Sequence, residues 1–381
     1  MSATSGPQKP LSRRPSPRAP AWSAACTTGT DCTMHQLAPY IGRMKTTIAQ
    51  FLIQRCTEPG NLVVDPFCGS GVVPLESALS GRRVLAGDVN PYAVVLTKAK
   101  LFPPSSEDLA KRQLTRHWTA AAARVHEVDL RRVPAWVRSF FHSETLRAAI
   151  ALCNELLERR SWFLLSCLLG ILHHQRPGFL SFPSSHLVPY LRANLFPRES
   201  YPDMYGYREV LPRMLAKVHR AFRRPAEQPH LGARVLLSDS RRLPLPAQID
   251  AVITSPPYMN ELDYVRDNRL RLWFLTRELP EREATARNRE ERFRTLMRET
   301  LRHLAPKTAA TARIALVVGD VTRGGWKSDA RALIDDVFRG EKTLSRFRLK
   351  EIYCDLIPDI RRSRRDLRGT KHEYVLVYEG H

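Results

Sequence analysis

The fold is decided by the stretch Leu62-Val63-Val64-Asp65-Pro66-Phe67-Cys68-Gly69-Ser70-Gly71. Its β-branched start predicts a buried strand, and its Gly-x-Gly end predicts a tight turn whose backbone approaches a ligand closely. Residues 72–79 have the pattern of a helix, with Gly81 as its stop. A strand, a glycine turn and a helix in this order indicate the nucleotide-binding half of a Rossmann-like α/β unit.

A second predicted strand, 84–88, ends in an acid. Asp88 lies about 20 residues beyond the glycine turn, the spacing at which a carboxylate reaches ribose hydroxyls. The turn is neither Gly-x-Gly-x-x-Gly nor Gly-Lys-Ser/Thr. The pattern therefore favours neither a dinucleotide nor a triphosphate as ligand.

A third apolar run, 249–253, ends in Thr254-Ser255-Pro256-Pro257-Tyr258. Ligands of open α/β sheets lie at the carboxyl ends of strands. Each proline has a fixed φ and no N–H, so the turn is stiff and its carbonyls stay available as acceptors. We expect Ser255 and the turn backbone to accept hydrogen bonds from a planar amine, with Tyr258 stacking on it. The alternative is a proline turn with Tyr258 packed in the core.

With these motifs the chain resembles the S-adenosylmethionine-dependent amino-methyltransferases of DNA, particularly those that methylate N4 of cytosine. The resemblance covers residues 31–100 and 231–381. It implies a Rossmann-like methyltransferase fold: a mostly parallel seven-stranded sheet with an antiparallel edge strand, here with a mostly helical insertion. Relatives that methylate adenine more often carry Asp or Asn where Ser255 stands.

The resemblance also implies roles for individual residues. The expected catalytic residues are Ser255, Pro256, Pro257 and Tyr258. The expected S-adenosylmethionine-binding residues are Asp65, Pro66, Phe67, Cys68, Gly69, Ser70, Gly71, Asp88, Val89, Asp239, Thr254 and Tyr40. Asp239 would contact the adenine amino group, with a simple turn cap as its alternative. Gly42, Lys45 and Tyr92 are further candidates for the cofactor side, or packing residues. Cys68 is interpreted as a small filler.

The expected chemistry is methyl transfer to a flipped cytosine, with hydrogen-bond acceptors in place of a metal or a strong base. Relatives that methylate bases of tRNA or rRNA carry Asp- or Asn-Pro-Pro-Tyr on the same fold. The alternatives are therefore an N6-adenine DNA methyltransferase and an RNA base amino-methyltransferase. A third alternative is a nucleic-acid-binding protein with a degenerate site.

Composition points to a polyanionic partner. The net charge is +22, and excess Lys and Arg displaces counterions from phosphates. We expect double-stranded DNA, with RNA as the alternative, and a cognate restriction endonuclease as in restriction–modification systems. The seven cysteines form no Cys-x-x-Cys pair, and no apolar run reaches about 18 residues. We expect a protein of the bacterial or archaeal cytosol, associated with the nucleoid and not with a membrane.

The chain divides into four predicted parts. Residues 1–30 contain no acid and several prolines, which predicts a disordered basic tail. Residues 31–100 and 231–381 are the cofactor-binding and catalytic parts of the methyltransferase domain. Residues 101–230 form a helical insertion, predicted either to recognise nucleic acid or to be a scaffold bundle. Its last predicted helix, 207–224, has a basic face that includes Lys217.

Arginines near the catalytic part are expected to bind nucleic acid. Arg266 follows the Ser-Pro-Pro-Tyr loop, and a basic run lies between the last two predicted strands. The simplest role of this basic run is to bind phosphate groups. The alternative is that its charged side chains are only exposed to solvent. The run contains Arg361, Arg362, Arg364 and Arg365.

Overall fold

A computed structural model describes most of the chain. The described residues are 18, 22, 32–40, 42–174, 178–181, 196–225, 232–257, 268–278, 289–323, 326–356 and 372–381. No helix in these ranges is long and apolar enough to cross a membrane.

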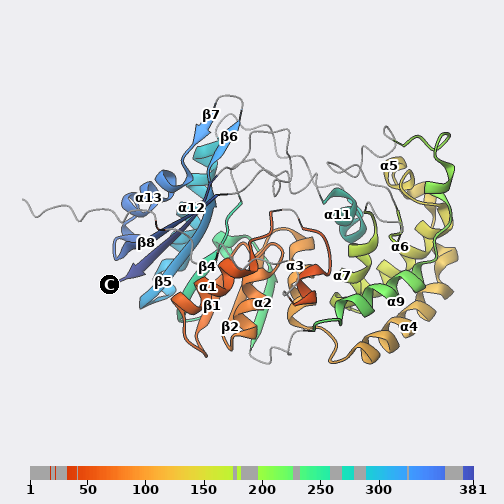
Figure 1. The fold of residues 1–381 in the computed structure, drawn as a ribbon, viewed down its shortest axis with the longest axis horizontal. Coiled ribbons are helices and arrows are strands. Elements are labelled where there is room, and N and C mark those ends of the chain that lie inside the picture. Colours follow the sequence, from red (N-terminus) through yellow and green to blue (C-terminus); the bar gives the residue numbers. More distant parts are fainter. Residues whose placement is uncertain are drawn as a thin grey trace, which may run out of the picture.

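A seven-stranded sheet organises the fold (Figure 1), with strand order β3-β2-β1-β4-β5-β9-β8. Neighbours from β3 to β5 pair in parallel, and β9 runs antiparallel between β5 and β8. The predicted fold class is confirmed. A separate hairpin, β6–β7, follows β5. The strands are β1 (Leu62–Asp65), β2 (Arg83–Asp88), β3 (Ala233–Leu237), β4 (Ile249–Thr254), β5 (Thr308–Gly319), β6 (Val321–Arg323), β7 (Trp326–Ser328), β8 (Phe347–Leu356) and β9 (His372–Gly380).

Helices cover both faces of the sheet. One face packs on α12 and α13, and the other packs on α1 and the start of α2. The α-helices are α1 (Thr46–Cys56), α2 (Val72–Leu79), α3 (Pro91–Leu101), α4 (Glu107–Ala123), α5 (Ala135–Arg138), α6 (Ser143–Glu158), α7 (Trp162–Ile171), α9 (Val210–Ala221), α11 (Arg269–Thr276), α12 (Arg289–Leu304) and α13 (Ala330–Gly340). Short 3-10 helices are η1 (Thr33–Gln36), η2 (Val125–Glu127), η3 (Leu130–Arg132), η5 (Pro202–Tyr205), η6 (Ser240–Arg242), η7 (Ala305–Lys307) and η8 (Lys342–Leu344).

The helical insertion lies between β2 and β3 in the chain and beside α3 in space (Figure 1). Helices α4, α6, α7 and α9 share one hydrophobic core with α3 and with the segment 34–38. A Cβ on Gly170 in α7 would stand 2.2 Å from the carbonyl oxygen of Leu37, so only glycine allows this approach. The insertion is therefore packed into the cofactor-binding part.

One residue of the predicted basic face, Lys217, does not lie on the surface. Lys217 in α9 is buried, and its Nζ donates a hydrogen bond to the carbonyl oxygen of Gln36 at 2.8 Å. Burial lowers the pKa of Lys217 to about 8. The prediction that Lys217 faces solvent is wrong, because α9 turns this position toward η1.

Two residues of the predicted tail, Arg18 and Trp22, contact the sheet and α1. The Arg18 N–H donates to the carbonyl oxygen of Ile352 at 2.8 Å, in a parallel bridge on the outer edge of β8. Trp22 is buried against Phe51 and Tyr353. An edge strand offers unpaired backbone groups, and an aromatic ring gains from burial, so these two residues dock despite the composition around them.

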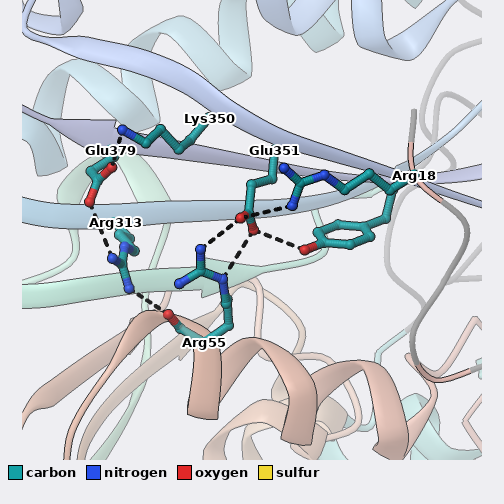
Figure 2. A network of polar contacts seen from close by, with 7 residues as sticks. Arg18, Arg55, Arg313, Lys350, Glu351 and Glu379 are labelled. Atoms are coloured by element: carbon teal, nitrogen blue, oxygen red, sulfur yellow. Dashed lines mark hydrogen bonds and ion pairs between the residues drawn. The ribbon is translucent and has the colours of Figure 1, made fainter. Parts of the chain in front are cut away.

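Two carboxylates join this edge to α1 and β5 (Figure 2). Glu351 is buried and accepts hydrogen bonds from Arg55 at 2.7 Å and from Tyr353 at 2.9 Å. Glu379 is paired with Arg313 and Lys350, with its side chain 21% exposed. Burial alone would raise the pKa of Glu351, but its partners outweigh burial and lower it.

We predict that Glu351→Ala lowers the free energy of unfolding by about 2 kcal/mol, because it removes charge-assisted hydrogen bonds at a buried position. Glu379→Ala, the more exposed control, should lose less than about 1 kcal/mol. Urea unfolding measures both. The stabilisation by Glu351 should be present above its unfolded-state pKa of about 4.3 and lost as pH falls through its lower folded value. Equal losses in the two variants would contradict this prediction.

Candidate functional site

The glycine turn joins β1 to α2 and depends on Gly71. Its φ is +71°, and an added Cβ would stand 2.7 Å from Thr97 Oγ1 and 3.0 Å from Thr97 Cα. The turn therefore packs closely against α3, and position 71 requires a left-handed backbone conformation and no side chain. Cys68 is buried beneath it, with its Sγ 3.5 Å from Thr97 Oγ1, which agrees with its interpretation as a filler.

Asp88, at the end of β2, holds this turn in place. One carboxylate oxygen accepts from the Gly69 N–H at 2.9 Å, and the other accepts from the Asn90 N–H at 2.8 Å. Burial raises the pKa of Asp88 to about 6 despite these hydrogen bonds. Each oxygen of an ionised carboxylate has a second lone pair, so Asp88 keeps acceptor capacity for ligand hydroxyls.

Apolar side chains stand beside the acids at this edge of the sheet. Val89 is 67% exposed, and Leu237, which pairs with Asp88 in the strand register, is 61% exposed. Exposed apolar surface beside carboxylates suits a purine ring that carries a ribose. These residues, with the glycine turn, fit S-adenosylmethionine.

Asp239 follows β3 and already performs a local role. Its side chain accepts from the Arg241 N–H at 2.9 Å, and it forms an ion pair with the Arg241 guanidinium at 2.6 Å. The bond to Arg241 lowers the pKa of Asp239 to about 2. Asp239 is thus the turn cap that the sequence offered as its alternative role, and contact with the cofactor remains a prediction.

The second predicted motif is linked to the first by one buried hydrogen bond. The Thr254 hydroxyl donates to Asp65 at 2.6 Å. Burial raises the pKa of Asp65 to about 7, although the bond from Thr254 acts in the opposite direction. Ser255 is half-buried and Pro257 is exposed at this edge. The Ser-Pro-Pro turn therefore begins directly beside the glycine turn.

The segment before α1 closes one side of the turn. The position of a Cβ on Gly69 lies 3.4 Å from the Tyr40 ring, which stacks on Tyr92 at 5.8 Å between centroids. Tyr92 is fully buried and donates to the carbonyl oxygen of Pro39 at 2.7 Å, so the packing alternative holds for this residue. Lys45 forms an ion pair with Asp355.

Sequence reasoning missed a buried polar group beneath the turn. Lys100 is 1% exposed, and its Nζ donates to the carbonyl oxygen of Ser70. The signal in the sequence was a lysine near the end of a mostly apolar predicted helix. Among the described residues, no group of three or more His, Cys, Asp or Glu side chains could hold a metal ion.

Several predicted site residues lie outside the described residues. They are Tyr258, Arg266, Arg361, Arg362, Arg364 and Arg365.

Comparison with known proteins finds similarity over most of residues 31–100 and the start of the insertion. Residues 36–130 match the model of a family described as UPF0020, RMKL-like methyltransferase domain. The match contains the glycine turn, Asp88 and the Tyr40 segment.

Two curated relatives match short stretches. The first is a tRNA (guanine(6)-N(2))-methyltransferase THUMP3 of Bos taurus, 37% identical over 54 residues. The second is the type II methyltransferase M.MjaII of Methanocaldococcus jannaschii, 24% identical over 78 residues. The stretches cover 13% and 20% of this chain, and only 11% and 15% of the relatives' own lengths.

Among solved structures, TrmN from Thermus thermophilus aligns with 91% of this chain and 52% of its own, at 14% identity. Its TM-score is 0.38. The strand order, the glycine turn and the family match together show a methyltransferase domain whose cofactor is S-adenosylmethionine.

We predict that Gly71→Ala weakens binding of S-adenosylhomocysteine by about tenfold or more, because the new methyl group must displace Thr97 and open the turn. Gly81→Ala is the matched control, since Gly81 also has a positive φ but its Cβ would meet only Pro59 at 3.8 Å. It should cost about 1 kcal/mol of stability and leave affinity unchanged. Calorimetry would measure both, and a Gly71→Ala variant with normal affinity would contradict the prediction.

We also predict that cofactor affinity falls about tenfold between pH 7 and pH 5, because the ionised form of Asp88 is the better acceptor and its pKa is about 6. Calorimetric titration with S-adenosylhomocysteine at several pH values measures this step. Asp88→Asn should bind weakly and without the step. A step of unchanged size in Asp88→Asn would assign it to another group.

Proposed function

We propose that the protein transfers a methyl group from S-adenosylmethionine to the exocyclic amine of a base in RNA. The observation that carries the transfer to an amine is the position of Ser255-Pro256-Pro257. This turn starts at the carboxyl end of β4, one residue beyond the hydrogen bond from Thr254 to Asp65 in the cofactor motif. This position supports a role for the motif as an acceptor of amine hydrogens beside the proposed binding site of the methyl donor.

The chemistry requires little beyond acceptors and position. The lone pair on an exocyclic amine is delocalised into the base, so the nitrogen is a poor nucleophile. We infer that the Ser255 hydroxyl and the Pro256 carbonyl accept the two amine hydrogens and localise the pair on nitrogen. The bound cofactor supplies an activated methyl group. Alignment of the amine with that methyl group then provides most of the rate, and the proton leaves once the nitrogen is cationic.

RNA is favoured by the relatives and compatible with the charge. The relative of higher identity methylates N2 of guanine in tRNA, which is an exocyclic amine. The net charge of +22 suits any polyanion and does not distinguish RNA from DNA. In RNA, unpaired bases in loops offer their amines without the energy needed to open a duplex.

DNA is the second candidate, and Ser255 favours it. Serine before Pro-Pro-Tyr is the pattern of the resembled cytosine-N4 enzymes, whereas the resembled RNA enzymes carry Asp or Asn. The match to a type II methyltransferase points the same way. In this case the substrate is a cytosine flipped from double-stranded DNA, and a cognate restriction endonuclease would be the partner.

A product assay separates the candidates. Labelled S-adenosylmethionine is offered with total RNA and with genomic DNA in separate reactions, and the nucleosides are identified by mass spectrometry. A methylated exocyclic amine in RNA alone supports the proposal. N4-methylcytosine in DNA alone replaces it with the second candidate, and N6-methyladenine in DNA keeps the mechanism but changes the base.

We predict that Ser255→Ala lowers kcat by about 100-fold or more while cofactor affinity stays unchanged, because one acceptor for the amine is lost. Ser255→Asn is the matched control, since its amide oxygen keeps an acceptor at the position, and it should retain measurable turnover. Single-turnover rates and calorimetry give the two quantities. Parallel loss of turnover and cofactor binding in a folded Ser255→Ala would argue against a role at the amine.

A further inference from the structure

The helix that supports the glycine turn carries a lysine in its buried face. Lys100 in α3 is 1% exposed, and its Nζ donates to the backbone carbonyl oxygen of Ser70 in the middle of the turn. Ser70 itself is buried. The side chain thus reaches the turn from α3, within the buried interior.

No carboxylate among the described residues accepts a hydrogen bond from Lys100 Nζ. Glu76 in α2 is an acid that acts on Lys100, but its two oxygens are already 2.6 Å from His35 Nε2 and 2.8 Å from Gln50 Nε2. Arg43, whose guanidinium donates to the carbonyl oxygen of His35, adds a like charge. Burial, followed by Arg43, lowers the pKa of Lys100 to about 7, and the weaker influences of Cys32, Glu76 and Cys68 oppose this shift.

Such a lysine disfavours folding. A buried amine without an ion-pair partner loses hydration that a single hydrogen bond to a carbonyl does not fully replace. A methionine of similar length would fill the same space without this penalty. Any benefit of the amine therefore comes from its hydrogen bond to the Ser70 carbonyl oxygen.

The position of the Ser70 carbonyl oxygen affects the geometry of the turn. A peptide unit is planar, so fixing the Ser70 carbonyl also fixes the Gly71 N–H, which donates to the Cys68 carbonyl oxygen at 2.7 Å. The Gly69 N–H on the other side is fixed by Asp88 at 2.9 Å. Lys100 and Asp88 therefore hold two peptide units of the turn, Ser70–Gly71 and Cys68–Gly69, from two different elements.

We propose that Lys100 is a positioning residue for S-adenosylmethionine, which locks the Ser70–Gly71 peptide in the orientation that the cofactor needs and does so at the expense of fold stability. The proposal rests on the cofactor and is independent of whether the methylated base lies in RNA or DNA.

The test compares Lys100→Met with Lys98→Met in the full chain. Lys98 lies on the same helix but over the Trp162 ring, 4.9 Å from its centroid, so the control makes the same chemical change away from the turn. Lys100→Met should weaken S-adenosylhomocysteine binding by about tenfold, the effect of one charge-assisted hydrogen bond, while its Tm is equal to or above that of the wild type. Lys98→Met should bind normally. Lys100→Gln, with a shorter donor, should bind with intermediate affinity.

Measuring Tm over a pH series adds a test, because a role in packing alone would not make the Tm difference depend on pH. The folded pKa of Lys100 is lowered, so its destabilising effect is complete below about pH 7 and shrinks as pH rises toward the unfolded value of about 10.4. The Tm advantage of Lys100→Met should therefore be largest near pH 6 and decline at higher pH. His35, Arg43, Glu76, Cys32 and Cys68 are present in both proteins, so their titrations cancel to first order in this difference.

Three results would overturn the proposal. Normal binding by a folded Lys100→Met would show that the hydrogen bond to Ser70 does not position the cofactor. Loss of both Tm and affinity would make Lys100 an ordinary core residue. Failure of the wild type itself to bind S-adenosylhomocysteine would reject the cofactor together with this proposal, whereas failure to methylate nucleic acid with normal binding would reject only the proposed substrate.

Discussion

One buried hydrogen bond, from Thr254 to Asp65, joins two motifs that lie 189 positions apart in the chain. It forms because β1 lies between β2 and β4 in the sheet, with all three strands parallel. Parallel pairing brings the carboxyl ends of these strands to one edge, and the glycine turn, Asp88 and the Ser-Pro-Pro turn all follow those ends. The position of every other group at the site depends on this pairing.

The insertion between β2 and β3 holds the segment that precedes α1. Its helix α9 holds the segment before α1 through two hydrogen bonds, from Lys217 to the Gln36 carbonyl at 2.8 Å and from Thr33 to the Ala221 carbonyl at 2.6 Å. Gly170 in α7 packs against the backbone of the same segment. Since that segment places Tyr40 beside the glycine turn, the insertion supports the position of this turn.

Ionisable groups gather around the turn in an environment that disfavours their charges. Burial raises the pKa of Asp65 to about 7 and that of Asp88 to about 6, and it lowers the pKa of Lys100 to about 7. Each of these groups binds backbone or a hydroxyl of the turn region instead of an opposite charge. Such an arrangement rigidifies a loop at a cost to stability, which is typical of sites that must be preorganised for a ligand.

The sequence alone determined the local elements: the strand, turn and helix over 62–79, the acid at Asp88, the strand before Ser255 and the last two strands. These follow from periodicity, glycine and proline, which act between near neighbours in the chain. Tertiary structure alone decided that Lys100 and Lys217 are buried, that Tyr92 packs, that Asp239 pairs with Arg241, and that Arg18 and Trp22 dock on β8. Each of these outcomes depends on which distant segment lies opposite a side chain, and neither residue type nor spacing records that.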